Sequence, residues 1–350
     1  MKSLNIGGFF RSGSPIGLCV ILCAAIAPAE IQADSAPSFT SSPLFPLTQG
    51  LVPFADPAPL RLGKGELAVS DAFTWTNTLR LDNESEWPGY SLIVDGETLV
   101  DRLSVAGGLG SGVTVGGWCE GTYLWPGVFD GIIADFHHFF GFANQWRDQV
   151  PPNQLNIVVD TPAGTIDSVH ESVLSVDSLG FKLDWHPPGA SMLPDFEAMV
   201  KVPVSAPAPW MFAGLPAIEL SSSYGFSWRF IEASAAVGLA WQDLPSGLEG
   251  VPLQAWLPQA SARLFLDLTP DFSVGAVAAA EQSPFAIDEW YLGGIVSNVW
   301  FGASSVLAPG LRLETAMIEE LLSWASIEVG FQAGLEWVIP PPRHFGTSSG

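Results

Sequence analysis

The chain has 350 residues, of which 48% are hydrophobic and 14% charged, and its formal net charge is −23. So acidic a protein, without a basic stripe, is poorly suited to phosphate backbones, which argues against nucleic acid as a partner. Fourteen tryptophans and 22 phenylalanines beside only four tyrosines, with few charges, are typical of a lipid-facing surface with aromatic residues at the membrane interfaces.

Residues 1–33 are predicted to be a secretory signal peptide. Lys2 and Arg11 supply its positive region, and the stretch "PIGLCVILCAAIA" supplies a short apolar core. That core is too short to cross a bilayer as a helix, which takes about 20 apolar residues. Cleavage can follow Ala29 or Ala33, and we favour Ala33 because a polar mature end then begins.

After cleavage, residues 34–62 form a leader and residues 63–338 a single domain. Cys119 is then the one cysteine left, which excludes a disulfide scaffold. The sequence offers no later run of apolar residues long enough for a membrane helix. An exported, hydrophobic chain of this kind is either a secreted β-sandwich or a transmembrane β-barrel.

Two connecting segments follow in chain order. Gly108 to Gly112 superficially resemble a phosphate-binding glycine loop, but no helix follows them, so a hairpin turn is predicted there. The triplet His170-Glu171-Ser172 contains the residue types of nucleophilic catalysis. Neighbours in a strand point to opposite faces, so this spacing does not build a catalytic triad.

The segment 129–147, "FDGIIADFHHFFGFANQWR", is predicted to be an amphipathic helix with one aromatic face. Asp130 and His137 fall on nearly the same line of that helix, and Asp135 lies one turn before His138. These four residues could handle protons or bind a metal. They lack the ligand geometry of a strong metal motif, so we favour a loop helix whose aromatic face packs on the barrel rim or wall.

The stretch 217–230, "AIELSSSYGFSWRF", alternates between an apolar and a polar face, as a strand does. Its length exceeds the ~5–6 residues of a globular strand and suits the ~9–11 that cross a membrane at a tilt. The same alternation recurs in 178–185, 260–269 and 328–338, with Phe265 as an exception. Four charged residues are expected to face the lumen, where they would solvate the interior or select solutes: Lys182, Glu219, Arg229 and Arg263.

Short and long connections alternate between these strands, which is the outer-membrane arrangement. The prediction is therefore an all-β, antiparallel transmembrane β-barrel of about 12 strands (range 10–14), with one amphipathic helix in a long connection. The count is open between twelve and thirteen around residues 153–174. Trp337 fits the aromatic end of the last strand, and residues 339–350 are a C-terminal tail.

Three stretches resemble landmarks of a bacterial outer-membrane family catalogued as a domain of unknown function, number 3187. They are "VDGETLVDRLSVAGGLGSGVTVGG" (94–117), the helical segment 129–147, and "EELLSWASIEVGFQAGLEW" (319–337). The resemblance implies an outer-membrane β-barrel and no established activity. The matching positions are Asp95, Gly96, Glu97, Thr98, Phe129, Asp130, His137, Gly141 and Arg147.

The functional expectation is a passive channel or binding barrel for small solutes in the outer membrane of a Gram-negative bacterium, partly closed by the helix 129–147. The alternatives are an outer-membrane hydrolase of lipid or lipopolysaccharide that uses His137, His138 or His170, and a secreted β-sandwich binding module. We expect no cofactor and assign no catalytic or metal residue. Outer-membrane lipid, the barrel-assembly machinery and small solutes are the expected partners. The candidate functional positions are Asp130, Asp135, His137, His138, Arg147, Arg229 and Arg263.

Overall fold

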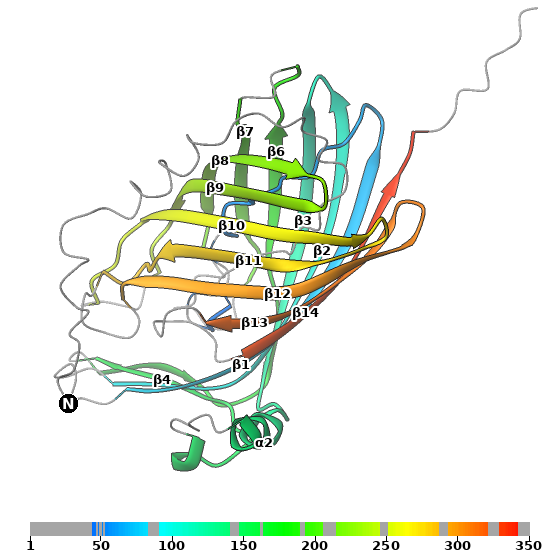
Figure 1. The fold of residues 1–350 in the computed structure, drawn as a ribbon. Helices are drawn as coiled ribbons and strands as arrows, with labels where there is room; N and C mark the ends of the chain where they lie inside the picture. Colours follow the sequence, from blue (N-terminus) through cyan, green and yellow to red (C-terminus); the bar gives the residue numbers. More distant parts are fainter. Residues whose placement is uncertain are drawn as a thin grey trace, which may run out of the picture.

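The structure, a computed structural model, describes residues 44–46, 48, 51, 53–82, 91–140, 147–161, 164–189, 193–205, 215–245, 251–286, 293–320 and 329–341. The predicted signal peptide and its cleavage site lie outside these residues, as does nearly all of the tail. The described chain forms one antiparallel sheet that curls into a barrel (Figure 1). Its strands are β1 (Leu67–Asp82), β2 (Ser91–Gly110), β3 (Val113–Trp125), β4 (Asn156–Thr161), β5 (Gly164–Val169), β6 (Val173–Trp185), β7 (Asp195–Pro203), β8 (Ala217–Trp228), β9 (Ile231–Gln242), β10 (Trp256–Thr269), β11 (Phe272–Gln282), β12 (Ile295–Ala308), β13 (Leu311–Glu320) and β14 (Val329–Ile339).

The sheet closes because β1 pairs with β14 on one side and with β2 on the other. The ring therefore holds twelve strands: β1, β2, β3 and β6 to β14. The expected strand number is confirmed. The open count around residues 153–174 also has its explanation, since β4 and β5 form a hairpin outside the ring. β4 pairs with Ser91–Asp95 of β2, just before β2 begins its pairing with β3 at Glu97.

The two ends of the barrel differ in their connections. Short turns at 111–112, 229–230, 270–271 and 309–310, together with the connection 186–194, lie at one end, here called the turn end. Long connections lie at the other, the loop end. The first and last barrel residues, Leu67 and Ile339, pair with each other at the turn end. In Figure 1 the turns lie toward the top and right, while α2 and β4 lie at the bottom.

The glycine-rich stretch before residue 113 is the hairpin turn that the sequence predicts. Gly110, Ser111 and Gly112 all have positive φ, at 90°, 55° and 76°. Positive φ in a two-residue loop matches the right-handed twist of the strands that it joins. A helix does not follow, so this stretch presents no phosphate-binding helix terminus.

Burial is inverted relative to a soluble protein, because the apolar residues of the ring face outward. On β8, Ile218, Leu220 and Trp228 are exposed, while Glu219 is buried. The predicted alternation is likewise confirmed on β6, β10 and β14. An exposed apolar wall around a polar interior is the arrangement of a transmembrane barrel and not of two packed sheets. The β-sandwich alternative is therefore wrong.

The predicted helix is present in the described part of 129–147. It runs over α2 (Asp130–Phe140), and a short 3-10 helix, η2 (Arg147–Gln149), lies at the end of that segment, while residues 141–146 lie outside what the structure describes. Within the described ranges, no helix has both the length and the apolar character needed to cross a membrane.

Candidate functional site in the barrel lumen

A stretch of the leader, residues 53–62, runs through the interior of the barrel and is here called the lumen segment. The amide of Ala55 donates to Oε1 of Gln259 on β10 at 2.9 Å. Nζ of Lys182 on β6 lies 3.6 Å from Asp56. Because β6 and β10 lie on different sides of the ring, a chain that reaches both must pass between them.

Phe54 anchors the lumen segment in an apolar patch of the inner wall. Its ring meets the edge of Trp300 with 6.1 Å between centroids. Phe265, the exception to alternation on β10, is fully buried and belongs to the same cluster. A buried phenylalanine contributes about 1.5–3 kcal/mol, so this patch holds the segment firmly. The cluster also contains Leu44, Val277, Ala279, Ala316 and Ile318.

The lumen segment leaves the barrel at the turn end. The amide of Leu62 donates to Oγ1 of Thr114 at 3.3 Å, and the carbonyl of Leu60 lies 3.3 Å from the ring of His186. Nη2 of Arg61 donates to Asp195 on β7 at 2.6 Å. A charged, partly exposed clasp therefore closes this end, while the apolar anchor lies deeper.

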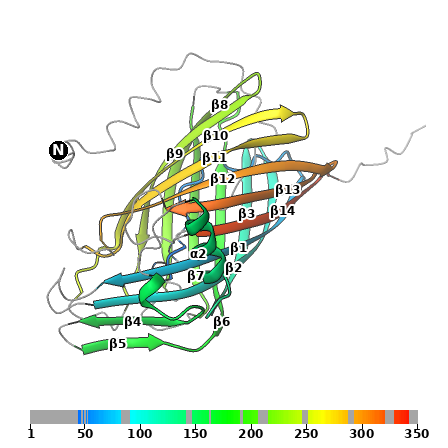
Figure 2. The same cartoon turned by 60° about the horizontal axis from the view of Figure 1, so that its bottom comes forward.

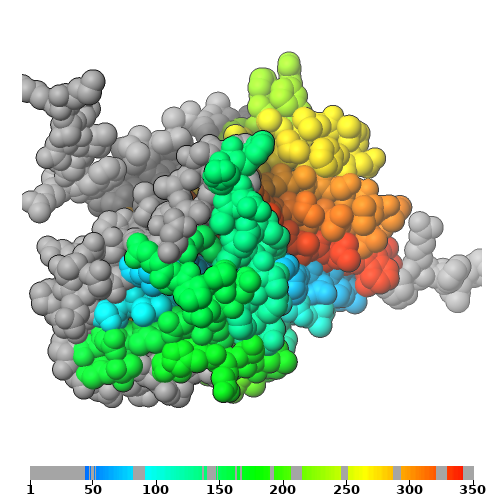
Figure 3. Space-filling view, turned by 90° about the horizontal axis from the view of Figure 1, so that it is seen from below, coloured from blue at the N-terminus to red at the C-terminus, as the bar shows by residue number. Residues whose placement is uncertain are grey.

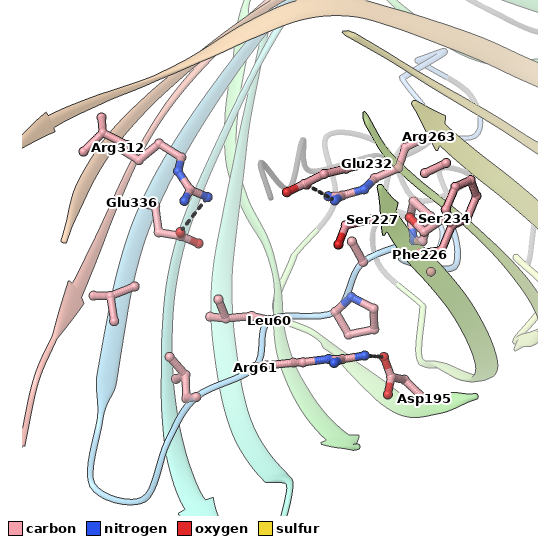
Figure 4. A pocket seen from close by; sticks show the side chains of 18 of the residues that line it. Leu60, Arg61, Asp195, Phe226, Ser227, Glu232, Ser234, Arg263, Arg312 and Glu336 are labelled. Carbon is pink, nitrogen blue, oxygen red and sulfur yellow. Dashed lines mark hydrogen bonds and ion pairs between the residues drawn. The ribbon is translucent and has the colours of Figure 1, made fainter. Parts of the chain in front are cut away.

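A cavity of about 390 Å³ remains between the lumen segment and one side of the wall (Figure 4). Two wall pairs line it. Arg263 Nη2 donates to Glu232 at 3.1 Å, while Arg312 and Glu336 lie 3.7 Å apart, too far for a hydrogen bond. Arg61 reaches the same space from the segment. The cavity is therefore lined by charges of both signs among apolar residues, and its volume suits a small solute.

A second cavity of about 140 Å³ lies on the other side of the lumen segment. Lys182 lines it together with four carboxylates, of which Glu336 also lines the first cavity and the other three lie near the Lys182 ammonium. Its Nζ lies 2.7 Å from Glu197 and 3.6 Å from both Asp184 and Asp56. Since Asp56 belongs to the segment and the others to the wall, Lys182 is the cation that joins them.

The sequence-predicted lumen residues are only partly borne out. Arg263 is 7% exposed and faces inward, as do Lys182 and Glu219. Arg229 does not. β8 ends at Trp228, two residues before the alternating stretch 217–230 ends, so Arg229 falls in the turn with φ 57°. Its guanidinium lies over the ring of the outward-facing Trp228 at 5.0 Å.

The structure brings Asp130 and Arg147 together. The Asp130 carboxylate accepts hydrogen bonds from Arg147, from Nδ2 of Asn77 at 3.0 Å and from the amide of Asn153 at 2.6 Å. Arg147 also donates to the Asn77 side chain. This network ties the start of α2 to β1, which is a structural role.

The remaining histidine candidates do not form a site with these groups. Asp135 and His138 are exposed on α2, and the side chain of His137 lies outside what the structure describes. His170 is exposed in the connection between β5 and β6. In the described part of the chain, no group of three or more His, Cys, Asp or Glu is placed to hold a metal ion.

Glu97 plays a part that sequence reasoning did not assign to it. Its carboxylate accepts from Nε1 of Trp75 at 2.6 Å and from the amides of Val128, at 2.8 Å, and Phe129. The Phe129 ring lies 3.8 Å from Trp75 and 5.8 Å from Phe331, centroid to centroid.

Trp75 and Phe331 alternate with inward-facing residues, so their side chains point away from the lumen. The chain that enters the helix therefore lies on the outside of the wall. The expectation that the helix partly closes the lumen is wrong, because Phe129, the residue before it, has its partners on the outer surface. The lumen segment fills the interior instead. Its signal in the sequence is the presence of large apolar residues on the inner face, such as Phe265 and Trp300, which need something to pack against.

No family model matches the chain, and no curated protein matches its sequence. Among solved structures, it is similar to an outer membrane channel from Pseudomonas putida F1, with 10% identity, 79% of this chain and 97% of that chain covered, and a TM-score of 0.49. It is also similar to the NanC porin, with 8% identity, 77% and 98% covered, and a TM-score of 0.41. The translocator domain of the autotransporter NalP from Neisseria meningitidis gives 10% identity, 79% and 89% covered, and a TM-score of 0.40. At such identities and TM-scores, these similarities carry no argument about activity.

Proposed function

We propose that the protein is a passive outer-membrane channel for small polar solutes, closed in this structure by the lumen segment. The observation that carries the proposal is the course of residues 53–62 through the polar interior, with cavities of about 390 and 140 Å³ on its two sides. A packed protein interior has few voids larger than a water molecule. Two cavities lined by charged residues and separated by a single stretch of chain suggest a passage that this stretch obstructs.

Opening then requires the lumen segment to move aside or out of the barrel. Its clasp at the turn end is the partly exposed ion pair of Arg61 with Asp195, which water can replace at little cost. Deeper in the barrel, Asp56 of the segment must leave Lys182. Its anchor, Phe54, must leave an apolar patch. The solute would then diffuse past inward-facing charges, and these would set selectivity. Such a channel needs no energy source and no cofactor.

We further propose that the protein resides in the outer membrane of a Gram-negative bacterium after loss of residues 1–33. The exposed apolar wall supports the membrane placement, and the positive and apolar regions of the N-terminus support export. Membership of the family of unknown function number 3187 stays a proposal that rests on the sequence landmarks alone.

Planar-bilayer conductance tests the channel directly. The mature chain is compared with a variant lacking residues 44–62 and with a control lacking residues 342–350. The first deletion should give long-lived open channels, while the mature chain and the control conduct rarely. Heat-modifiable gel mobility reports whether each barrel is folded. A folded barrel without residues 44–62 that still does not conduct would overturn the proposal.

A disulfide lock tests the obstruction without removing any residue. Ala55 on the lumen segment and Ser261 on β10 are joined by a hydrogen bond from the serine hydroxyl to the Ala55 carbonyl. The variant carries Ala55→Cys and Ser261→Cys, with Cys119→Ser to remove the native thiol. The oxidised protein should stay closed at every voltage, and reduction should restore the rare openings. Openings of equal frequency in both states would contradict the role of the segment.

A further inference from the structure

The helix α2 lies against the outside of the barrel near its loop end. The residues just before it are fixed there by Glu97 and by the aromatic contacts of Phe129 with Trp75 on β1 and Phe331 on β14. Figure 2 shows α2 in front of these strands, and Figure 3 shows it as part of the exposed surface of this end. The helix therefore begins at the seam at which the first and last strands meet.

One apolar edge of α2 is exposed. Ile133 is buried at 6% exposure, but Ile132 and Phe139 are 60% and 82% exposed. Seven residues make nearly two full turns, so Ile132 and Phe139 lie on one line of the helix. That line is about 100° from Ile133, the residue that is buried. The exposed edge therefore runs along the flank of the helix.

This edge continues the apolar outer surface of the barrel. On the strands beneath α2, Phe73 and Phe331 point outward and are 43% and 46% exposed. Aromatic residues near the end of a paired stretch are typical of the membrane interface, and Trp75 lies two residues before β1 ends its pairing with β14 at Asn77. Large apolar side chains contiguous with a lipid-facing surface are favoured in lipid and disfavoured in water.

We infer that α2 is an interfacial helix, with Ile132 and Phe139 immersed in the lipid leaflet at the loop end of the barrel. His138, which lies about 100° from Phe139 on the exposed side, then faces water. The inference rests on the membrane placement under the proposed function and is independent of the channel. It assigns to α2 a lipid-binding surface that helps to hold the closing seam of the barrel at a fixed depth.

Spin-label accessibility tests this inference. Single cysteines replace Phe139, His138 and the wall residue Leu264 in a Cys119→Ser background, and the labelled proteins are reconstituted in phosphatidylcholine–phosphatidylglycerol vesicles. Oxygen partitions into lipid and a nickel chelate into water. The ratio of oxygen to nickel accessibility should be several-fold higher at position 139 than at 138 and should approach that at 264.

The outcomes separate the two proposals. A lipid-like ratio at 264 with equal, water-like ratios at 138 and 139 would overturn the interfacial helix and leave the membrane barrel intact. A water-like ratio at 264 would overturn the membrane placement itself and the helix with it. An Ile132→Cys label should match position 139, because both lie on the same line of the helix.

Discussion

Two glycines at the turn end separate the cost of a strained backbone from the cost of a close contact. Gly112 and Gly189 have similar positive φ values of 76° and 71°. A Cβ on Gly112 would lie 1.8 Å from the carbonyl oxygen of His186, whereas one on Gly189 would have no heavy atom within 4 Å. The contact is with backbone that also carries a hydrogen bond, since the His186 amide donates to the Gly112 carbonyl at 2.7 Å.

We therefore expect Gly112→Ala to destabilise the barrel more than Gly189→Ala. Both substitutions place a Cβ in a left-handed conformation, at about 1 kcal/mol each. Only the first must also displace the β6–β7 connection, which adds roughly 1–3 kcal/mol. Urea unfolding of the reconstituted proteins, followed by tryptophan fluorescence, measures the difference. Equal losses would show that the connection yields freely at His186.

Lys182 offers a test of how the lumen segment is held. Replacing it by Met leaves Asp56 of the segment facing Asp184 and Glu197 without the cation that joins them. Removing one partner of a buried charge cluster costs about 3–5 kcal/mol. Lys182→Met should therefore raise the frequency of channel opening.

The double variant Lys182→Met with Asp56→Asn tests whether the opening is caused by repulsion between Asp56 of the segment and the carboxylates of the wall. Groups in one ion-pair network are not additive, so the second substitution should restore part of the closed population that the first removes. The frequency of channel opening, recorded at pH 7 for both single variants and for the double variant, completes the double-mutant cycle. Additive effects would mean that Lys182 does not act through Asp56.

The strands show how far the sequence predicts the fold. Period-two alternation needs only the chemistry of neighbouring residues, and it identifies the outward and inward faces of β6, β8, β10 and β14 correctly. It fails where the surroundings of a residue are set by a distant part of the chain. Phe265 breaks the pattern because it packs in one buried cluster with Phe54 of the lumen segment. The lumen segment, rich in proline, has no periodicity, so its place inside the barrel could not be predicted from local pattern.

The helix shows a second limit of prediction from the sequence. Its amphipathic pattern predicts that one face packs on something, and it does, but the pattern does not say on which side of the wall. That side is decided by Glu97 and Trp75, which lie more than thirty positions earlier and meet Phe129 only in the folded barrel. Arg229 is a second example. The alternation places it on a strand, but the strand ends at Trp228 and Arg229 lies in the turn.

Asp130→Asn should loosen α2 without unfolding the barrel. The substitution removes the charge that Arg147 and the Asn153 amide bind. Hydrogen bonds to a charged group contribute about 1.5–3 kcal/mol, so local opening of the helix should rise by roughly 10- to 100-fold. Hydrogen exchange of residues 130–140 measures it. Asp135→Asn, on the exposed side of the same helix, is the matched control and should change little.

The β4–β5 hairpin, outside the ring, carries a pH-dependent contact. Thr165 Oγ1 donates to Asp160 at 2.6 Å and Ser91 Oγ at 2.7 Å, and these bonds, that of Thr165 first, lower the pKa of Asp160 below its ordinary value of 3.8. A lowered folded-state pKa stabilises the hairpin above pH 3.8, and this stabilisation is lost as the pH falls through the folded value.

Thr165→Val should therefore raise the pKa of Asp160 toward 3.8, because a carboxylate that loses a donor is protonated more readily. Carboxyl carbon chemical shifts in micelles follow the titration. Ser168→Ala changes an exposed hydroxyl on the same strand and should leave the pKa in place. A pKa of Asp160 that is the same in both variants would assign the shift to Ser91 alone.

The molecule as a whole separates its chemistry into an apolar outside and a charged inside, and the inside is not neutral. Carboxylates outnumber cations on the inner wall that the structure describes. The carboxylates are Glu120, Asp177, Asp184, Asp195, Glu197, Glu219, Glu232, Asp267, Glu281, Glu314, Glu320 and Glu336, and the cations are Arg80, Arg102, Lys182, Lys201, Arg263 and Arg312. An excess of one sign in a pore of low dielectric walls concentrates the opposite ion.

The barrel without residues 44–62 should therefore prefer cations, and its reversal potential in a potassium chloride gradient should have the cation-selective sign. Glu336→Gln should weaken that preference, because it removes an inner carboxylate and leaves Arg312 without the partner that lies 3.7 Å away. Asp71→Asn removes the same charge from an exposed position on the outer face and should leave selectivity unchanged. Both variants lose one negative charge, and they differ only in the side of the wall from which that charge is removed. An anion preference, or equal shifts in both variants, would show that the inner charges do not govern permeation.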